Sequence, residues 1–380
     1  MTGCVKPIPP AEREQRIEKA RRLMAQNSID AIVVEPGSSM MYFTGTRWGR
    51  SERTFAMVLP VRGDLAFVVP GFEEGRAREV VRFTSDIRVW QEDESPYERI
   101  VGVLRDRGIR AGRIGFEETV RFFIFDGVRK VAPGYEFVSG DPVTAGCRMI
   151  KSPAELALLK LANEISLEAI KAAAPTAHDG MMQPEFQANL QACFRALGAP
   201  AGGLILFGKY TASPHGTIEP QRLRDGDFVL VDAGCTVEGY VGDVTRTFMV
   251  GKPSDKQRRV WDLERKAQDA VLAAARPGVA CEVLDAVARK LIVYAGFGPD
   301  YRLPGLPHRT GHGVGLDGHE WTNLVRGNKT KLEAGMCFSD EPTIAIPGEF
   351  GVRLEDCFHV TEDGAKMFTP QSPSIDQPFG

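Results

Sequence analysis

Apolar positions in the first part of the chain follow a helical rhythm and then a strand-like one. Between Pro10 and Ser28 they recur at helical spacing in a charged background, which predicts an amphipathic helix. Short β-branched runs follow, and Gly and Asp between the last two are typical of a hairpin. Further helical patterns alternate with short strands, so we predict a small α/β domain. The expected strands cover 31–35, 54–60 and 65–69, and the later helices cover 72–82, 95–108 and 119–131.

Two helix-start signals organise the rest of the chain. Ser152-Pro153-Ala154-Glu155 has the form of a capping box with proline at the first helical position, so we expect a long helix to follow it. Ser254-Asp255-Lys256-Gln257 is a second capping box and predicts a helix over 257–275. The chain pattern breaks near Gly146, and this divides it into expected domains 1–148 and 149–380. The second domain should also contain a helix over 282–295, a hairpin of 227–233 with 240–250, and strands within 336–360.

Composition narrows the class of protein. The 380 residues are 43% hydrophobic and 26% charged, with a net charge of −3, which is ordinary for a soluble two-domain protein. Without a basic excess we expect no nucleic-acid partner. Without a long apolar run or a secretory signal we expect no membrane partner and a cytoplasmic location. Seven scattered cysteines without a CxxC pair favour free thiols in a reducing compartment and argue against a thiolate zinc site.

Four carboxylates stand out because their neighbours are apolar. Asp232 ends the run FVLV, and Asp243 lies after a turn, so a hairpin would place the two side by side. Glu341 follows MCFSD, and Glu355 lies within VRLEDCFHV. Such carboxylates are costly to ionise unless a cation holds them, and two divalent cations would balance four negative charges.

His312 supplies a nitrogen ligand to the same predicted site. All six histidines follow residue 177, which confines histidine chemistry to the second domain. Gly311 and Gly313 flank His312 and would let the backbone approach the metals closely. An oxygen-rich site with one imidazole suits Mn²⁺, Co²⁺, Fe²⁺ or Zn²⁺. Two such ions polarise a carbonyl and generate hydroxide at neutral pH.

Taken singly, each of these residues has a simpler structural explanation. A lone Asp at a strand end is usually a turn residue, and Glu355-Asp356 could be a solvated pair. Gly311-x-Gly313-x-Gly315 lacks the further glycine and the following helix of a nucleotide-binding loop, so we reject that function. Taken together, the residues would require several unrelated coincidences.

The same segments resemble those of the prolidase and Xaa-Pro aminopeptidase family of metallopeptidases. The resemblance covers most of the chain from Cys147 onward, including IKSPAE and the closing VTEDG, and SSMMYFTGTRWG resembles the smaller domain of that family. It implies an α+β protein with a pita-bread (creatinase/aminopeptidase-like) catalytic domain after a smaller N-terminal α/β domain. It also implies a homodimer, and the nearest likeness is to bacterial Xaa-Pro dipeptidases.

The resemblance implies a role for each site residue. Asp243 and Glu355 would bridge two metal ions, with Mn²⁺ placed first and Co²⁺, Zn²⁺ or Fe²⁺ as alternatives. Asp232 would bind one ion, and His312 and Glu341 the other. Glu341 would also act as general base. The remaining expected residues are His215 and His319, which would contact the substrate and stabilise the tetrahedral intermediate, and His308 and Arg353, which would support the substrate.

These roles predict hydrolysis of X-Pro bonds in short peptides, with an Xaa-Pro dipeptidase as the first choice. An Xaa-Pro aminopeptidase, or another small-molecule amide hydrolase on this fold, is the alternative. A non-catalytic binding module ranks last, because such proteins usually lose metal ligands and all five are present here. One departure concerns the substrate loop, where Trp321-Thr322 follows His319-Glu320 and many relatives have a proline two residues after the Glu.

Overall fold

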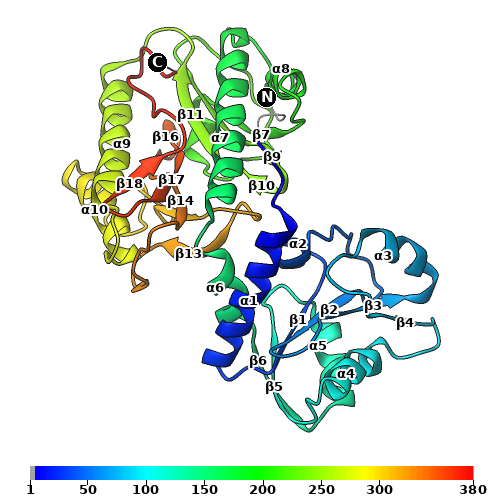
Figure 1. Cartoon of the computed structure of the whole chain (residues 1–380). Coiled ribbons are helices and arrows are strands. Elements are labelled where there is room, and N and C mark those ends of the chain that lie inside the picture. Colours follow the sequence, from blue (N-terminus) through cyan, green and yellow to red (C-terminus); the bar gives the residue numbers. More distant parts are fainter. Residues whose placement is uncertain (1–4, 380) are drawn as a thin grey trace. The chain divides into compact units, whose positions relative to one another are not determined.

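The computed structural model describes residues 5–379 and divides into two compact units. The first unit is Ile8–Arg148, drawn mainly in blue and cyan in Figure 1. The second begins at Met149 and also includes the residues just before Ile8. Each unit has its own apolar core.

The first unit is built on a mixed six-stranded sheet with the order β4-β3-β2-β1-β5-β6. The predicted hairpin is confirmed, because β2 and β3 pair antiparallel with Met57 opposite Phe67. Helices α4 and α5 pack on one face of the sheet over a core that includes Val33 and Val58. The strands are β1 (Ala31–Val34), β2 (Ala56–Pro60), β3 (Ala66–Pro70), β4 (Ile87–Trp90), β5 (Gly112–Phe116) and β6 (Tyr135–Ser139).

Three of the four helices expected in this unit have nearly the predicted bounds. They are α1 (Pro10–Gln26), α4 (Pro96–Asp106) and α5 (Phe122–Val131). The fourth splits into a 3₁₀ turn, Gly71–Glu73, and α3 (Glu74–Val80). Two helices were not expected, α2 (Ser38–Thr44) and α6 (Asp141–Arg148). Gly146 lies inside α6, so the chain leaves this helix two residues later than the pattern indicated.

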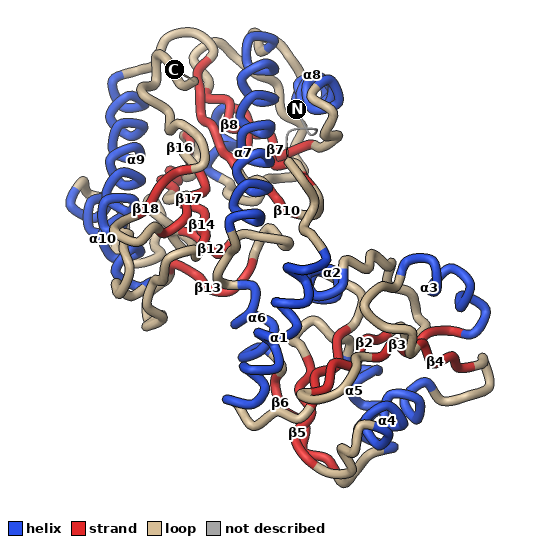
Figure 2. Tube along the Cα trace, viewed as in Figure 1, coloured by secondary structure: helices blue, strands red, loops and turns tan. Residues whose placement is uncertain are grey.

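The second unit places its strands between helices, and Figure 2 shows α7 and α9 flanking them. The larger sheet has the order β13-β12-β14-β17-β18, and a three-stranded sheet has the order β11-β8-β7. The helices are α7 (Pro153–Ala173), α8 (Gln183–Ala196), α9 (Asp255–Ala274) and α10 (Cys281–Tyr294). The strands are β7 (Gly202–Phe207), β8 (Phe228–Gly234), β9 (Thr236–Val237), β10 (Tyr240–Val241), β11 (Val244–Met249), β12 (Gly311–Gly313), β13 (Glu320–Leu324), β14 (Cys337–Asp340), β15 (Thr343–Ile346), β16 (Phe350–Arg353), β17 (Asp356–Val360) and β18 (Ala365–Met367).

Both predicted capping boxes start their helices. The Ser152 side chain accepts from the Glu155 N–H, while the Glu155 carboxylate accepts from the Ser152 N–H at 2.9 Å. Ser254 and Gln257 form the same reciprocal pair at the start of α9. These bonds satisfy backbone donors that a helix otherwise leaves unpaired. The helix predictions there follow from local chemistry, which explains their accuracy.

The predicted hairpin of the second unit is confirmed, with an interruption. Strands β8 and β11 pair antiparallel with Asp232 opposite Thr245. The returning strand breaks at Gly242 and Asp243, which lie between β10 and β11. An isolated bridge from Thr245 to Glu355 then links β11 to the connection between β16 and β17. This cross-link brings two of the predicted acidic segments together.

Among residues 5–379, no helix combines the length and the apolar character that crossing a bilayer requires.

Candidate metal centre

Backbone pairing in the second unit brings together segments that are far apart in sequence. Strands β14 and β17 pair with Asp340 opposite Asp356, so the residues next to them, Glu341 and Glu355, lie at the same end of the two strands. The Glu341 N–H also donates to the Thr310 carbonyl at 2.9 Å, close in sequence to β12. The five predicted ligands occupy β8 (Asp232), the residue before β11 (Asp243), β12 (His312), the residue after β14 (Glu341) and the link from β16 to β17 (Glu355).

The His312 ring directs an unprotonated nitrogen at two carboxylates. Its Nδ1 lies 3.1 Å from the Gly313 carbonyl oxygen, which can only accept, so Nδ1 carries the proton. Nε2 then presents its lone pair 3.3 Å from Glu341 Oε1 and 3.7 Å from Asp243 Oδ2. Burial lowers the pKa of His312 to about 3, with the neighbouring His319 lowering it further. Facing lone pairs repel each other unless a cation lies between them.

Asp243, His312 and Glu355 form the tightest part of the site. One ligand atom from each lies within 4.8 Å of the others. Glu355 Oε2 accepts from Thr245 Oγ1 at 2.5 Å. Its other oxygen, Oε1, is buried and has no hydrogen-bond partner in the described part of the chain. An unpartnered buried carboxylate oxygen is the feature expected of a metal ligand.

The carboxylates raise one another's pKa values. Burial raises the pKa of Asp243 and of Glu355 well above the usual range, and the charges of neighbouring carboxylates add to this. Burial also raises the pKa of Glu341 to about 7. Such a group of acids is stable in ionised form only when cations compensate it. The donor set, three carboxylates and one imidazole nitrogen, therefore fits divalent metal ions.

Asp232 lies near this group but makes a different contact. Its Oδ2 accepts from Arg353 Nη2 at 2.5 Å. Its charge raises the pKa of Asp243 and Glu341, which places it close to both. Unlike Asp243, Asp232 is not in the cluster whose ligand atoms lie within 4.8 Å. A metal ion at Asp232 would therefore have to compete with the Arg353 guanidinium for this oxygen.

Arg353 is buried, and its guanidinium donates hydrogen bonds to acceptors within the protein. Besides Asp232, it donates from Nε to Thr245 Oγ1 at 3.2 Å and from Nη1 to the Pro214 carbonyl at 3.1 Å. Its side chain is only 3% exposed. Arg353 was predicted to support the substrate. Its contacts instead hold Asp232 and the loop at Pro214 in place.

The other predicted histidines differ in their exposure and in their hydrogen-bond partners. His308 Nδ1 lies 2.6 Å from the Arg309 carbonyl and Nε2 lies 3.0 Å from Thr343 Oγ1, so both nitrogens have protein partners. His319 is exposed, and its ring stacks on His312 with centroids 3.7 Å apart. His215 is also exposed, and its charge lowers the pKa of His308 and His319. His215 and His319 are therefore the two that can reach a bound molecule.

A buried ion pair fixes the turn that carries His319. Lys151 Nζ donates to Glu320 Oε2 at 3.0 Å, and both side chains are almost fully buried. Glu320 Oε1 accepts from the Leu316 N–H at 2.8 Å. The first residues before α7 thus hold the loop between β12 and β13 in place.

The glycines beside His312 are required by close backbone contacts. A Cβ added to Gly311 would lie 2.1 Å from the Ser339 carbonyl oxygen. A Cβ added to Gly313 would lie 2.7 Å from the Glu320 carbonyl oxygen. Any side chain at these positions would push β12 away from β14 and β13, and His312 would move with it.

Three supporting residues had escaped the sequence reasoning. Asn163, buried on α7, accepts from the Asp243 N–H at 3.1 Å. Ser339 accepts from the His312 N–H at 3.0 Å, and Thr245 bonds both Glu355 and Arg353. The only signal for Asn163 was a polar residue on an apolar helix face, and nothing marked the other two.

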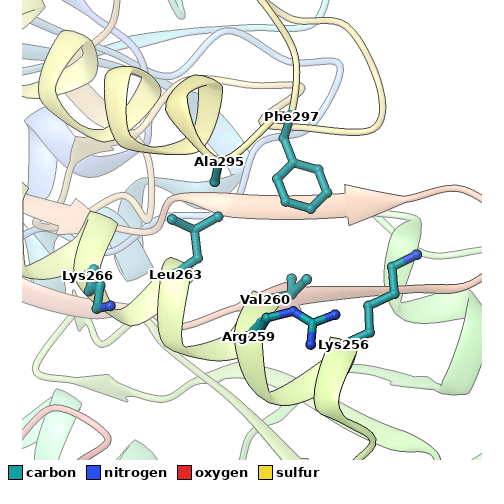
Figure 3. A pocket seen from close by; sticks show the side chains of 7 residues that line it. All are labelled: Lys256, Arg259, Val260, Leu263, Lys266, Ala295 and Phe297. Carbon is teal, nitrogen blue, oxygen red and sulfur yellow. The ribbon is translucent and has the colours of Figure 1, made fainter.

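A surface hollow between α9 and the end of α10 has a volume of about 420 Å³ and is lined by none of the predicted site residues. Figure 3 shows Lys256, Arg259 and Phe297 among its lining side chains. Its lining is basic and apolar, and it has no histidine or carboxylate.

Two family models match the chain. The model of metallopeptidase family M24 matches residues 157–362, and the Creatinase/Prolidase N-terminal domain matches residues 16–150. A protein named Xaa-Pro dipeptidase from Pyrococcus furiosus is 32% identical over 364 residues, covering 94% of this chain and 98% of that protein.

Solved structures give the same picture. Dipeptidase PepE from Mycobacterium ulcerans superposes with a TM-score of 0.89 at 30% identity, covering 97% of this chain and 99% of that one. An X-Pro aminopeptidase from Thermotoga maritima has a TM-score of 0.81 at 27% identity, covering 94% and 98% of the two chains. These likenesses confirm the predicted α+β class, with a pita-bread catalytic domain after a smaller N-terminal domain.

Proposed function

The chain belongs to metallopeptidase family M24, and from that premise we propose that it is a metal-dependent Xaa-Pro dipeptidase. The observation that carries the proposal is the His312 nitrogen facing the carboxylates of Glu341 and Asp243, with Glu355 beside them. This arrangement needs cations, and its donors are those that hydrolytic metals use. The P. furiosus relative, whose name is Xaa-Pro dipeptidase, matches along almost its whole length and supports the substrate class.

In the proposed site, Asp243 and Glu355 would be ligands common to two divalent ions, Asp232 would be a ligand of one, and His312 and Glu341 would be ligands of the other. The ions, when bound, supply a polarised carbonyl and a water of lowered pKa. The fit rests on the unpartnered Glu355 oxygen and on the lone pair of His312.

Cleavage of an X-Pro bond requires attack on a tertiary amide carbonyl, stabilisation of the oxyanion and a proton for the proline nitrogen. Glu341 would accept the proton of the attacking water and return it to the leaving nitrogen. His319 and His215 are exposed and can donate hydrogen bonds to the oxyanion.

An Xaa-Pro aminopeptidase is the second candidate, and the similarity to the T. maritima aminopeptidase favours keeping it. The two activities share the attack on the X-Pro carbonyl and differ in what lies beyond proline. A dipeptidase must recognise the free carboxylate of proline, whereas an aminopeptidase must accommodate a continuing chain.

The experiment measures proline released from a panel of X-Pro dipeptides by the purified protein with Mn²⁺, Co²⁺, Zn²⁺ or Fe²⁺. Ala-Pro should be cleaved far faster than Ala-Pro-Ala. The reverse order would make the protein an aminopeptidase. No release from any dipeptide with any of these metals would overturn the proposed function. Glu341→Gln serves as the control for contaminating peptidases.

The finer features of the enzyme are also proposals. We infer that Mn²⁺ is the working metal, that the enzyme is a homodimer and that it acts in the cytoplasm. The six cysteines in the described residues are free thiols, as expected in a reducing compartment. Elemental analysis of the protein as purified and light scattering test the metal and the oligomeric state.

A further inference from the structure

Arg309 is a guanidinium beside the candidate metal centre, and no carboxylate of residues 5–379 forms an ion pair with it. It is half-buried, and its Nη1 donates to Asn323 Oδ1 at 2.5 Å. Asn323 lies directly opposite His312 in the pairing of β13 with β12. Directly opposite residues of an antiparallel pair project to the same face, so Asn323 holds Arg309 on the face of the sheet that carries His312.

The electrostatics agree with this placement. Burial is the largest cause of the lowered pKa of His319, and the Arg309 charge is the next; the same charge also acts to lower the pKa values of His312 and Glu341. Within the described residues the side-chain partner of Arg309 is the neutral amide of Asn323. A partly buried guanidinium held by a neutral amide keeps its full positive charge and most of its donors.

Arg353 cannot serve as the anion receptor of this site. It is buried, and Asp232 already neutralises it, while Thr245 and Pro214 take further donors. A dipeptide cleaved at this site has a free carboxylate one residue beyond the scissile carbonyl. The site therefore needs a second cation for that group, and guanidinium groups match carboxylates in geometry.

We propose that Arg309, oriented by Asn323, binds the terminal carboxylate of the substrate and makes the enzyme a dipeptidase. This inference rests on the proposed function and names the residue that sets substrate length. An internal peptide bond or an amide in place of the carboxylate leaves the guanidinium without an anion, so longer peptides should bind less tightly.

The test compares Ala-Pro with Ala-Pro-amide, which lacks the carboxylate, in the metal-loaded wild type and in Arg309→Gln. The wild type should prefer Ala-Pro, and Arg309→Gln should lose about ten- to a hundredfold of that preference, mainly through a higher KM for Ala-Pro. The rate on Ala-Pro-amide should change little. Arg309→Lys should restore part of the preference, because it restores the charge but not the planar fork.

Asn323→Asp offers an independent variant that leaves Arg309 in place. The new carboxylate is nearly the same size as the amide and would form an ion pair with Arg309, so it should also raise the KM for Ala-Pro. Arg326→Gln removes a charge from an exposed pair with Asp300 and is the matched control, which should behave as wild type.

Calorimetric binding of proline and prolinamide separates this inference from the proposed function. If the wild type cleaves Ala-Pro and Arg309→Gln keeps the full preference for Ala-Pro over Ala-Pro-amide, the role of Arg309 is overturned while the proposed function stands. Wild type without any X-Pro activity would overturn the proposed function, and the binding data would then decide for Arg309. Tighter binding of proline that disappears in Arg309→Gln supports the inference, and equal binding of the two ligands by wild type refutes it.

Discussion

The stability of the second unit should be highly sensitive to substitution of Arg246. It lies on β11 with a fully buried side chain. Its Nη2 donates to Asp356 Oδ1 at 2.7 Å and to the Pro370 carbonyl at 2.8 Å. Its Nη1 donates to the carbonyls of Thr245 and Glu355 at 3.0 and 2.9 Å. One guanidinium thus ties β11 to the segment that carries Glu355.

Arg246→Met keeps most of the side-chain volume and removes the charge and all four hydrogen bonds. Asp356 would remain fully buried, with only Gln268 Nε2 at 3.1 Å and Thr369 Oγ1 at 2.7 Å as donors. Removing one partner of a buried ion pair costs about 3–5 kcal/mol, because the other charge stays desolvated. For a unit of this size that corresponds to a fall in Tm of roughly 6–20 °C.

The assay is differential scanning calorimetry of the metal-free protein in EDTA. A two-unit chain need not unfold in one step, so the transition of the second unit is first identified in a separate scan as the one whose Tm shifts when Mn²⁺ is added without EDTA. Asp356→Asn removes the stranded charge, so the double variant should lose clearly less than the sum of the single losses. Arg258→Met breaks an exposed pair with Asp376 and should leave the transition nearly unchanged. A loss below about 1 kcal/mol in Arg246→Met would refute the reasoning, since that is the scale of a surface pair.

Three further predictions concern the site and its charges. Glu341→Gln should abolish proline release while the far-UV circular dichroism stays unchanged, and His319→Ala should lower kcat more than metal content; full activity in either variant contradicts the assigned role. The pKa of Glu341 is about 7 in the folded protein and 4.5 in the unfolded chain, so the metal-free protein should lose stability as the pH rises from 4.5 to 7. The rise in Tm on adding Mn²⁺ should therefore be larger at pH 7.5 than at pH 5, and equal shifts would show that this acid does not hold a proton in the fold. Asp340 is fully buried with no partner for either carboxylate oxygen among the described residues, so Asp340→Val should stabilise the protein by about 1–2 kcal/mol in urea unfolding; a loss of stability would mean that the carboxyl has a partner such as a bound water.

Elements whose determinants are local could be predicted from the sequence. The capping boxes at Ser152 and Ser254 placed the starts of α7 and α9 to within a residue or two. Helix α8 also had a signal that was overlooked, because Phe186, Leu190 and Phe194 recur every fourth residue and are all buried. In contrast, α2 is buried on nearly all sides, so its sequence has no polar face and no helical period to detect.

The candidate ligands could be named because motifs mark them, but their surroundings could not. The bond from Asp243 to Asn163 spans 80 positions, and the ion pair of Asp232 with Arg353 spans 121. Such contacts depend on how separate strands and helices pack, and no local pattern encodes them. The same holds for Arg309, which becomes relevant only because β13 places Asn323 opposite His312.

The net charge of the site explains why it needs metal ions in addition to the Arg353 guanidinium. The four carboxylates of Asp232, Asp243, Glu341 and Glu355 with the Arg353 guanidinium leave three negative charges in a buried region when all are ionised. Without cations that excess is relieved by protonation, which is why the pKa values of three of these acids are raised. Two divalent ions would turn the excess into one positive charge. A net positive charge suits a reaction that passes through an oxyanion, because it stabilises the negative charge that develops on the carbonyl oxygen.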